Sequence, residues 1–381
     1  MKIPLFKNYS NREDTQEISK IIKSGRNWAI GEKISEFENK LSEYLKVKYS
    51  LVFNSGTSAL HALMITSGIK PNDEVIVPSF SFISTANSPL FVGAKPVFAD
   101  IKENTFGLDY KDVEKKITKH TKAILTVHYG GCSCQINKLK NIARHHRLLL
   151  LEDAAESLGS SFKNKKVGSF GAAAIFSFCG PKVISTGEGG ALVTNSRKIY
   201  EQAKLIRSHG RLDKSNYFSS LEKPNYVNLG YNFRMSNLAA SLGVTQLKKI
   251  EKIISLRQEN ALYLNSKLST VKEIIIPEAP PGHRHIYQMY TIRIKSGKEK
   301  RDKLKKFLNE KGVSAKIYFD PIHLSNFYKN MGYDQIKLPI TEKMYMEVLT
   351  LPMYPDLTKT EMDYIIRNIK KFFQNEKKRS S

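Results

Sequence analysis

Seven short apolar runs, set among segments with helical periodicity, constrain the fold of this chain more than any other feature. Each run has the length of a strand, and most are apolar throughout rather than at alternate positions. Strands of this kind are typical of parallel sheets that are covered on both faces. The runs are YSLVF (49–53), EVIVPSF (74–80), KPVFADI (95–101), KAILTV (122–127), LLLLED (148–153), AAIFSF (173–178) and GALVTN (190–195). The pattern predicts an α/β fold whose large domain holds a mostly parallel sheet.

Capping residues and apolar spacing indicate where helices lie. Ser35 and Glu38 match a capping box, which places a helix start just ahead of Phe37. Apolar residues recur at helical spacing from about Ser236 to Leu268, which predicts a long helical segment. This segment ends the alternation of strands and helices and leads into the rest of the chain.

A second, smaller unit is expected after this helical segment. The PEAPPG stretch (277–282) interrupts regular structure. A strand at QMYTIRI (288–294), a helix over residues 300–311 and a strand at SAKIYF (314–319) then follow. We therefore predict a large domain over residues 1–250, with the N-terminal segment included, and a small C-terminal α+β domain over residues 251–381.

Basic residues dominate the charge of the chain, with 61 Lys and Arg against 36 Asp and Glu and a net charge of +25. They are spread over the whole length, and no zinc-finger spacing, RNA-binding aromatic motif or basic-region heptad accompanies them. We interpret the charge as a solvated surface that favours anionic small molecules, and we expect no nucleic-acid partner.

Neither a membrane nor an oxidising compartment is indicated by the composition. No apolar run reaches the roughly 18–20 residues of a membrane-spanning helix, and the N-terminus has no apolar stretch of signal-peptide length. The three cysteines, Cys132, Cys134 and Cys179, are too few for a disulfide framework and lack zinc-ligand spacing. We expect a cytoplasmic protein with free thiols, no metal and no membrane insertion.

Two segments place candidate binding groups at the ends of strands. In FNSGTSALHAL (53–63) a strand passes into a helix, and the free N–H groups at a helix start bind anions. A plain N-cap accounts for the same Ser and Thr residues. In LLLLEDAAES (148–157) a buried strand ends at Asp153, where α/β proteins keep their ligand sites. A turn-forming aspartate is the alternative at that position.

Two further segments hold a lysine and a cluster of phosphate donors. AIFSFCGPKVISTGEGG (174–190) carries Lys182 between an irregular turn and a glycine-rich stretch. Lysines on constrained backbone among apolar neighbours serve as Schiff-base amines, whereas most lysines are simply solvated. NLGYNFRMSNLAA (228–240) places Asn232 and Arg234 just ahead of a helix that Ser236 caps.

Together the four segments have the layout of a pyridoxal 5′-phosphate (PLP) enzyme. This cofactor needs its phosphate held, its ring nitrogen kept protonated by a carboxylate and its aldehyde bonded to a lysine. An anion-binding helix start, a strand-end carboxylate and a lysine further along the chain supply these three groups. Each segment alone has an ordinary structural explanation, but their combination favours PLP chemistry.

The chain resembles the nucleotide-sugar aminotransferases of the DegT family, which are fold-type I PLP enzymes. The resemblance extends over nearly the whole chain and is carried by NSGTSAL, VIVPSFSFISTAN, EDAAESLGS, FSFCGPKVISTGEGG, GYNFRMSNLAA and PMYP. EDAAESLGS together with FSF-x-G-x-K is most similar to the perosamine-synthase branch, which aminates C4 of 4-keto-6-deoxy sugars.

The resemblance implies roles for individual residues around the cofactor. Lys182 forms the Schiff base and moves the proton, and Asp153 pairs with the pyridine nitrogen. Glu156 stands where many relatives have Gln or His near the ring hydroxyl, and Phe82 stacks on the ring. The expected phosphate contacts are Gly56, Thr57, Ser58, Ser177 and, from the second subunit of a homodimer, Asn232.

The resemblance also implies the substrates and the assembly. Glutamate donates the amino group and a keto-deoxy nucleotide sugar accepts it, at sites on the interface of a homodimer, for surface polysaccharide or glycan biosynthesis. Arg234 and His323 are expected to face the substrate, with an ion pair at a helix start and a solvated loop histidine as the alternatives. The identity of the nucleotide is left open, and so is the choice between amination at C4 and amination at C3.

Two other activities compete with amino transfer. A sister group of sugar dehydratases replaces the cofactor lysine with histidine, so Lys182 argues against dehydration. A PLP-binding regulator without turnover is the other alternative, and the intact lysine, carboxylate and phosphate-binding segment argue against it.

Overall fold

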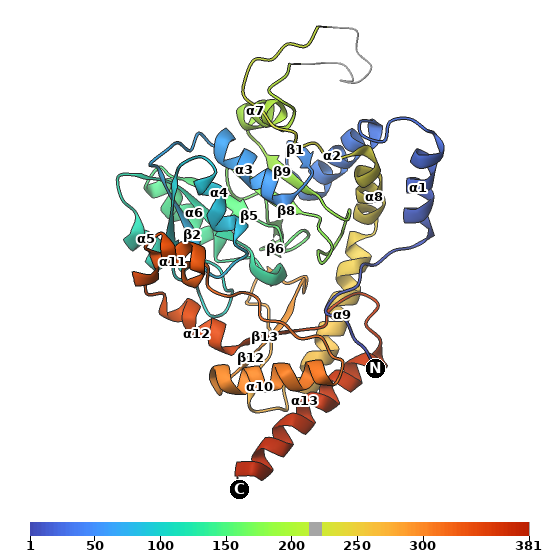
Figure 1. The fold of residues 1–381 in the computed structure, drawn as a ribbon, viewed down its shortest axis with the longest axis vertical. Coiled ribbons are helices and arrows are strands. Elements are labelled where there is room, and N and C mark those ends of the chain that lie inside the picture. The colour runs from blue at the N-terminus through green and yellow to red at the C-terminus, as the bar shows by residue number, and fades with distance from the viewer. Residues whose placement is uncertain (213–222, 381) are drawn as a thin grey trace.

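The computed structural model describes residues 1–212 and 223–380 of the 381-residue chain. Figure 1 shows a large α/β unit around a twisted sheet and a smaller unit below it, at the end where both termini lie. Helices α8 (Asn237–Lys248) and α9 (Ile250–Leu268) run down one side and connect the two units (Figure 1).

Seven strands form the central sheet, in the order β1-β9-β8-β5-β4-β2-β3. They are β1 (Tyr49–Phe53), β2 (Glu74–Pro78), β3 (Lys95–Ala99), β4 (Thr121–Val127), β5 (Leu149–Asp153), β8 (Ala173–Ser177) and β9 (Gly190–Thr194). Strand β9 is antiparallel to both of its neighbours, and the other neighbouring pairs are parallel. All seven apolar runs of the sequence therefore lie in this sheet, and the prediction of a mostly parallel sheet is confirmed.

Helices cover both faces of the sheet, which explains why its strands are apolar throughout. Besides α8, the helices of this unit are α1 (Arg12–Lys23), α2 (Glu32–Leu45), α3 (Gly56–Thr66), α4 (Ser84–Leu90), α5 (Tyr110–Lys116), α6 (Ile136–His145) and α7 (Arg197–Arg207), with the 3-10 turn η1 (Tyr129–Gly131). In β2, Val75 and Val77 belong to the core under α3, α4 and α7, whereas Ile76 belongs to the core under α5 and α6. Such alternation buries each strand on both sides.

Two helix predictions meet different outcomes. Ser236 caps α8 by accepting a hydrogen bond from the backbone N–H of Ala239, so the predicted helical segment is confirmed, with a break at Lys249. The capping box at Ser35 and Glu38 is wrong, because α2 begins at Glu32. The Glu38 carboxylate instead accepts the backbone N–H of Val52 (2.9 Å) and pairs with Arg207. A tertiary contact has taken the carboxylate that the local pattern assigned to a cap.

The smaller unit packs helices on a three-stranded sheet of order β10-β12-β13. Its elements after α9 are β10 (Ile274–Ile275), β12 (Tyr290–Ile294), α10 (Gly297–Glu310), η2 (Ile322–Leu324), α11 (Asn326–Asn330), η3 (Tyr333–Gln335), α12 (Pro339–Glu347), β13 (Val348–Leu351) and α13 (Lys359–Ser380). A second small sheet joins β6 (Ser161–Phe162), β7 (Lys165–Lys166) and β11 (His283–Arg284). Ile3 of the N-terminal segment is buried in the core of the smaller unit and bridges to Val313. The division of the chain at residue 250 stays a prediction.

The predicted strand at SAKIYF (314–319) is wrong. Ser314 donates its backbone N–H to the Ile3 carbonyl, and Lys316 pairs through both of its backbone groups with those of Thr350 on β13, but these pairings are isolated and do not make a strand. The chain then leaves the sheet, and the rings of Tyr318 and Phe319 line the cavity described below. The β-forming residue types of this segment are therefore used at a cavity wall rather than in a strand.

Candidate active site

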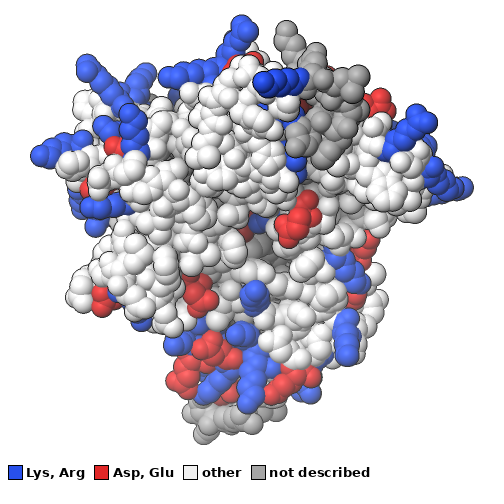
Figure 2. Space-filling view, turned by 45° about the horizontal axis from the view of Figure 1, so that its top comes forward, with Lys and Arg blue, Asp and Glu red and all other residues white. Residues whose placement is uncertain are grey.

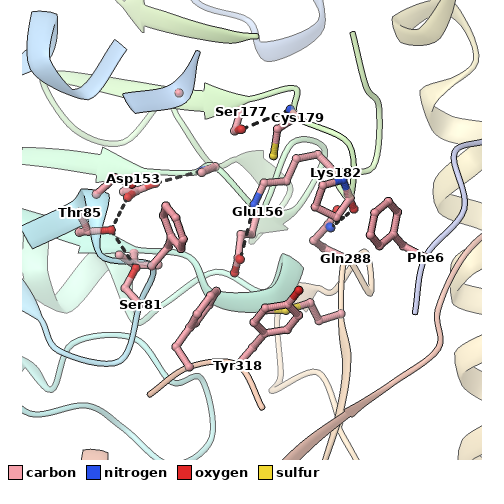
Figure 3. Close-up of a pocket in the computed structure, with 18 of the residues that line it drawn as sticks. Phe6, Ser81, Thr85, Asp153, Glu156, Ser177, Cys179, Lys182, Gln288 and Tyr318 are labelled. Atoms are coloured by element: carbon pink, nitrogen blue, oxygen red, sulfur yellow. Dashed lines mark hydrogen bonds and ion pairs between the residues drawn. The ribbon is translucent and has the colours of Figure 1, made fainter. Parts of the chain in front are cut away.

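A cavity of about 420 Å³ lies where the carboxyl ends of central strands of the large sheet meet the smaller unit. Its lining includes Phe6, Ser55, Gly56, Thr57, Ser81, Phe82, Thr85, Asp153, Glu156, Ser177, Cys179, Lys182, Glu188, Gln288, Lys316, Tyr318 and Phe319. Figure 3 shows these side chains converging from separate segments, with Lys182 between Glu156 and Gln288. Parallel strands present their carboxyl ends at one edge of a sheet, which is where ligand sites of open α/β sheets form.

Asp153 ends β5 and is buried at the wall of the cavity, with 4% of its surface exposed. Its carboxylate accepts hydrogen bonds from the Thr85 hydroxyl (2.7 Å) and the Ala155 backbone N–H (3.2 Å). Because the Thr85 hydroxyl donates to Asp153, it accepts from Ser81 at 2.8 Å (Figure 3). Burial raises the pKa of the Asp153 carboxyl. A cation bound in front of this carboxylate would favour its ionised form.

Lys182 lies on the turn after β8, with its amine directed into the cavity (Figure 3). Its Nζ is 3.6 Å from Oε1 of Glu156, whose other oxygen accepts the backbone N–H of Gly130 at 2.9 Å. The Gln288 side chain donates to the carbonyl of Pro181, the residue directly before the lysine. Glu156 therefore positions the amine, and Gln288 holds the backbone of the turn that carries the lysine.

The start of α3 forms one end of the cavity. Ser55 caps the helix by accepting from the Ser58 backbone N–H at 3.0 Å, and the two hydroxyls are 2.8 Å apart. A Cβ added to Gly190 would lie 2.5 Å from the Ser55 carbonyl oxygen and 2.6 Å from the Gly56 nitrogen. Only glycine permits β9 to approach the helix start this closely. The first N–H groups of α3 have no acceptor within the helix, so this end is suited to an anion.

Four of the predicted residues that the structure describes, Ser58, Asn232, Arg234 and His323, do not line this cavity. The backbone N–H of Ser58 is taken by the Ser55 cap. Asn232 is exposed, and its backbone oxygen accepts from the Asn54 side chain at 3.2 Å. Arg234 is half-buried, bridges to Phe53 through its backbone and donates to the Ser208 hydroxyl at 3.3 Å. Among the described residues that line the cavity, neither side chain appears.

His323 is fully buried, so the alternative of a solvated loop histidine is wrong. Its backbone N–H donates to the Ser79 hydroxyl (3.0 Å), and its Nδ1 lies 2.7 Å from the same oxygen. Its Nε2 is 3.6 Å from Glu342, and burial lowers the pKa of the ring. His323 joins η2 to the end of β2 and does not line the cavity within the described part of the chain. We assign it a structural role.

Other residues of the site have no distinctive sequence signal. Thr85 lies one turn after Phe82 in SFISTAN, and its bond to Asp153 follows only from the packing of α4 against β5. Phe6, Gln288 and Lys316 belong to segments far apart in the chain. Neither their spacing nor their residue types connect them to Lys182 in the sequence.

The residues present fit PLP on three observations. A buried carboxylate at the cavity wall is available to a ring nitrogen, an amine is directed into the cavity beside Glu156, and a helix start with a glycine-only contact has N–H groups that suit a phosphate. When bound, this cofactor supplies an electron sink that the protein side chains lack. The fold and the site define a PLP-dependent enzyme of fold-type I.

Comparison with known proteins gives the family. The model of the DegT/DnrJ/EryC1/StrS aminotransferase family matches residues 8–370, and the chain belongs to this family. A GDP-perosamine synthase from Caulobacter vibrioides is 36% identical over 340 residues, 89% of each chain. A UDP-4-amino-4,6-dideoxy-N-acetyl-beta-L-altrosamine transaminase from Campylobacter jejuni is 33% identical over 344 residues, 88% of each chain. The solved structure of Helicobacter pylori PseC, an aminotransferase involved in the biosynthesis of pseudoaminic acid, matches with a TM-score of 0.93 and 30% identity, over 98% of this chain and 100% of that chain.

These findings confirm the expected fold class, the aminotransferase activity and PLP as the cofactor. All three cysteines are free, as expected. Within the described residues, no helix is long and apolar enough to cross a membrane, and no three metal-ligating side chains form a cluster.

Proposed function

We propose that this enzyme transfers the amino group of glutamate to C4 of a 4-keto-6-deoxy nucleotide sugar, in the biosynthesis of a surface polysaccharide or glycan. The similarity to a GDP-perosamine synthase over 89% of the chain carries the choice of substrate. The cavity that unites Lys182, Asp153 and the start of α3 supports the chemistry.

Lys182 is the proposed group that bonds the cofactor and moves the proton. Its amine reaches into the cavity and lies 3.6 Å from the Glu156 carboxylate. At this distance the Glu156 carboxylate forms an ion pair with the ammonium and holds it in place. The backbone N–H of Gly130 holds the other Glu156 oxygen and so keeps this carboxylate aimed at the amine.

Asp153 is the proposed partner of the cofactor ring nitrogen. Thr85 and Ala155 bind its two oxygens and fix the plane of the carboxylate, and burial removes water that would weaken the interaction. Keeping the ring nitrogen protonated is the role that makes the bound cofactor effective as an electron sink.

The phosphate and the ring have separate proposed contacts. Gly56, Thr57 and Ser177 line the cavity at the start of α3, where backbone N–H groups and hydroxyls are available to a phosphate. Ser58 lies on the first turn of this helix with its hydroxyl 2.8 Å from that of Ser55, and we propose that it supports this contact. The Phe82 ring is 60% exposed, which leaves it free to stack on a planar ligand.

A homodimer completes this proposal. Asn232 is exposed beside the start of α3 yet outside the cavity of its own chain, which supports a contact with the phosphate in a second copy. Tyr226 (58% exposed) and Leu229 (72% exposed) lie on the same segment and give it an apolar surface to bury. Two-fold contacts are the commonest way to close such an assembly. Arg234 follows on this segment, and we propose that it contacts the substrate across the interface.

A screen of 4-keto and 3-keto nucleotide sugars tests this function. Each sugar, carried on GDP, UDP or dTDP, is incubated with glutamate and the PLP-loaded enzyme, and the amino sugar is detected by mass spectrometry. Product from a 4-keto-6-deoxy sugar supports the proposal. Product from 3-keto sugars alone replaces it with C3 amination. No amino sugar, together with salt-dependent binding to DNA, points to the regulator.

A further inference from the structure

The charge of the cavity wall poses a problem for an anionic substrate. Among the described residues that line it, the acidic side chains are Asp153, Glu156 and Glu188, and the basic ones are Lys182 and Lys316. Lys182 lies against Glu156, so its charge is largely compensated. A nucleotide sugar brings about two negative charges at its diphosphate, which this wall would repel without a further cation.

Lys316 is the second cation, and it lies where three hollows of the surface meet. It lines the cavity itself, a hollow bordered by Phe82 and Phe319, and a groove bordered by Lys305 and Lys306. Figure 2 shows the visible face hollowed between its larger upper part and the lower part, with Lys and Arg side chains scattered over both. A substrate that does not fit into the cavity of about 420 Å³ must extend out of it through the mouth.

The backbone and the side chain of Lys316 are both held. Its N–H donates to the Thr350 carbonyl (3.1 Å), and its carbonyl accepts the Thr350 N–H (2.8 Å), which pins the residue to the edge of β13. Its Nζ lies 4.8 Å from the centre of the Tyr318 ring. The side chain is exposed, and within residues 1–212 and 223–376 no carboxylate lies at ion-pair distance from it.

We infer that Lys316 is a specificity-determining residue that binds the diphosphate of the nucleotide sugar at the mouth of the cavity. This inference rests on the proposed function and adds to it the residue that binds the negatively charged diphosphate of the amino-group acceptor. The ammonium supplies freely rotating N–H donors that suit phosphate oxygens. The sugar then extends inward to Lys182 and the nucleoside outward along the groove. Glutamate is short enough to enter the cavity whole, so its binding does not depend on this contact.

Steady-state kinetics of Lys316→Gln, Lys316→Arg and wild-type enzyme test the inference. For Lys316→Gln, KM for the nucleotide sugar is expected to rise about tenfold, the worth of one charge-assisted hydrogen bond at an open site. The glutamate half-reaction, followed by the absorbance of the bound cofactor, stays normal, and Lys316→Arg restores most of the affinity. KM of the wild type rises with ionic strength, and that of Lys316→Gln rises less steeply. Lys311→Gln is the matched control, because Lys311 is also exposed and lies 5.7 Å from the centre of an aromatic ring, that of Phe307, away from the cavity.

An unchanged KM for the nucleotide sugar overturns the inference, and so does an effect confined to the glutamate half-reaction, which would assign Lys316 to the donor carboxylate. Equal effects of Lys316→Gln and Lys311→Gln also overturn it, because they would reflect net charge alone. Wild-type enzyme that aminates none of the nucleotide sugars would instead remove the proposed function. The two failures are therefore distinguishable in the same set of assays.

Discussion

Replacing Glu152 by Gln should destabilise the protein strongly, although this residue does not line the cavity. Glu152 precedes Asp153 on β5 and is fully buried. One carboxylate oxygen accepts the backbone N–H groups of Phe170 (2.8 Å) and Gly171 (2.7 Å). The other accepts the Gly168 N–H (2.8 Å) and faces Nε2 of His128 at 3.0 Å. The carboxylate thus satisfies donors on both sides of the strand that presents Asp153.

The magnitude follows from the number of donors left without an acceptor. Burial lowers the pKa of His128, but its contacts with Cys134 and Glu152 outweigh burial and raise it to about 10. Nε2 therefore carries a proton and donates to Glu152 in the charged ring, as it does in the neutral ring, whose Nδ1 accepts the Cys134 backbone N–H at 3.2 Å. An amide has one acceptor oxygen, and its NH2 group must therefore face two N–H donors in either orientation. Each buried donor without an acceptor costs about 1–3 kcal/mol, which gives a loss of about 2–6 kcal/mol in the free energy of unfolding.

Urea unfolding of the apo-protein, followed by circular dichroism, measures this loss for Glu152→Gln against wild type. Glu114→Gln is the control, because Glu114 is 56% exposed and lies 4.0 Å from His146, so its effect should stay within about 0.5 kcal/mol. A loss below about 1 kcal/mol for Glu152→Gln would refute the count of unsatisfied donors.

The difference in the free energy of unfolding between wild type and Glu152→Gln should also depend on pH. Burial alone would raise the pKa of Glu152, but the hydrogen bond and the charge of His128, together with the hydrogen bonds from Gly171 and Gly168, outweigh burial and hold the pKa below its ordinary value. A carboxyl group whose pKa is lowered on folding stabilises the protein above its unfolded pKa, and this contribution is lost as the pH falls through the folded pKa. The difference between wild type and Glu152→Gln should therefore be full near neutral pH and shrink below about pH 4. A stability difference that grows as the pH falls would contradict this prediction.

Three further substitutions test the site directly. Lys182→Ala should lose both turnover and the visible absorption band of the bound cofactor, and normal turnover would remove Lys182 from the mechanism. Asp153→Asn should keep the fold and the cofactor but lower the rate of transamination by about 10²–10⁴, since breaking a buried charge pair costs about 3–5 kcal/mol. Near-normal rates would give Asp153 another role. Gly190→Ala should weaken PLP binding to the apo-protein in a titration, because its Cβ would lie 2.5 Å from the Ser55 carbonyl oxygen. Unchanged affinity there would show that β9 and the start of α3 can separate without cost.

The sequence by itself determined the sheet and the chemistry of the large unit. Its strands are buried on both faces and are therefore apolar at nearly every position. This pattern is visible in the sequence of each strand, so all seven were recognisable. The groups for the cofactor follow the same logic. Asp153 ends one strand of this sheet, Lys182 lies on the turn after another, and Ser55 lies between a strand and a helix. Parallel strands bring such positions to one edge, which is why motifs far apart in the chain indicated one site.

Tertiary structure alone decided what surrounds these groups. Glu38 has the spacing of a capping-box residue, yet its carboxylate accepts the Val52 N–H and pairs with Arg207. Only the folded chain brings these two residues near it. His323 lies in the core against Ser79 instead of at the surface. The opposite wall of the cavity comes from the smaller unit, where Lys316 leaves the edge of β13 after a single pairing. Local sequence patterns report which backbone a segment prefers and which side is buried, whereas the partner of a polar side chain depends on contacts between distant segments.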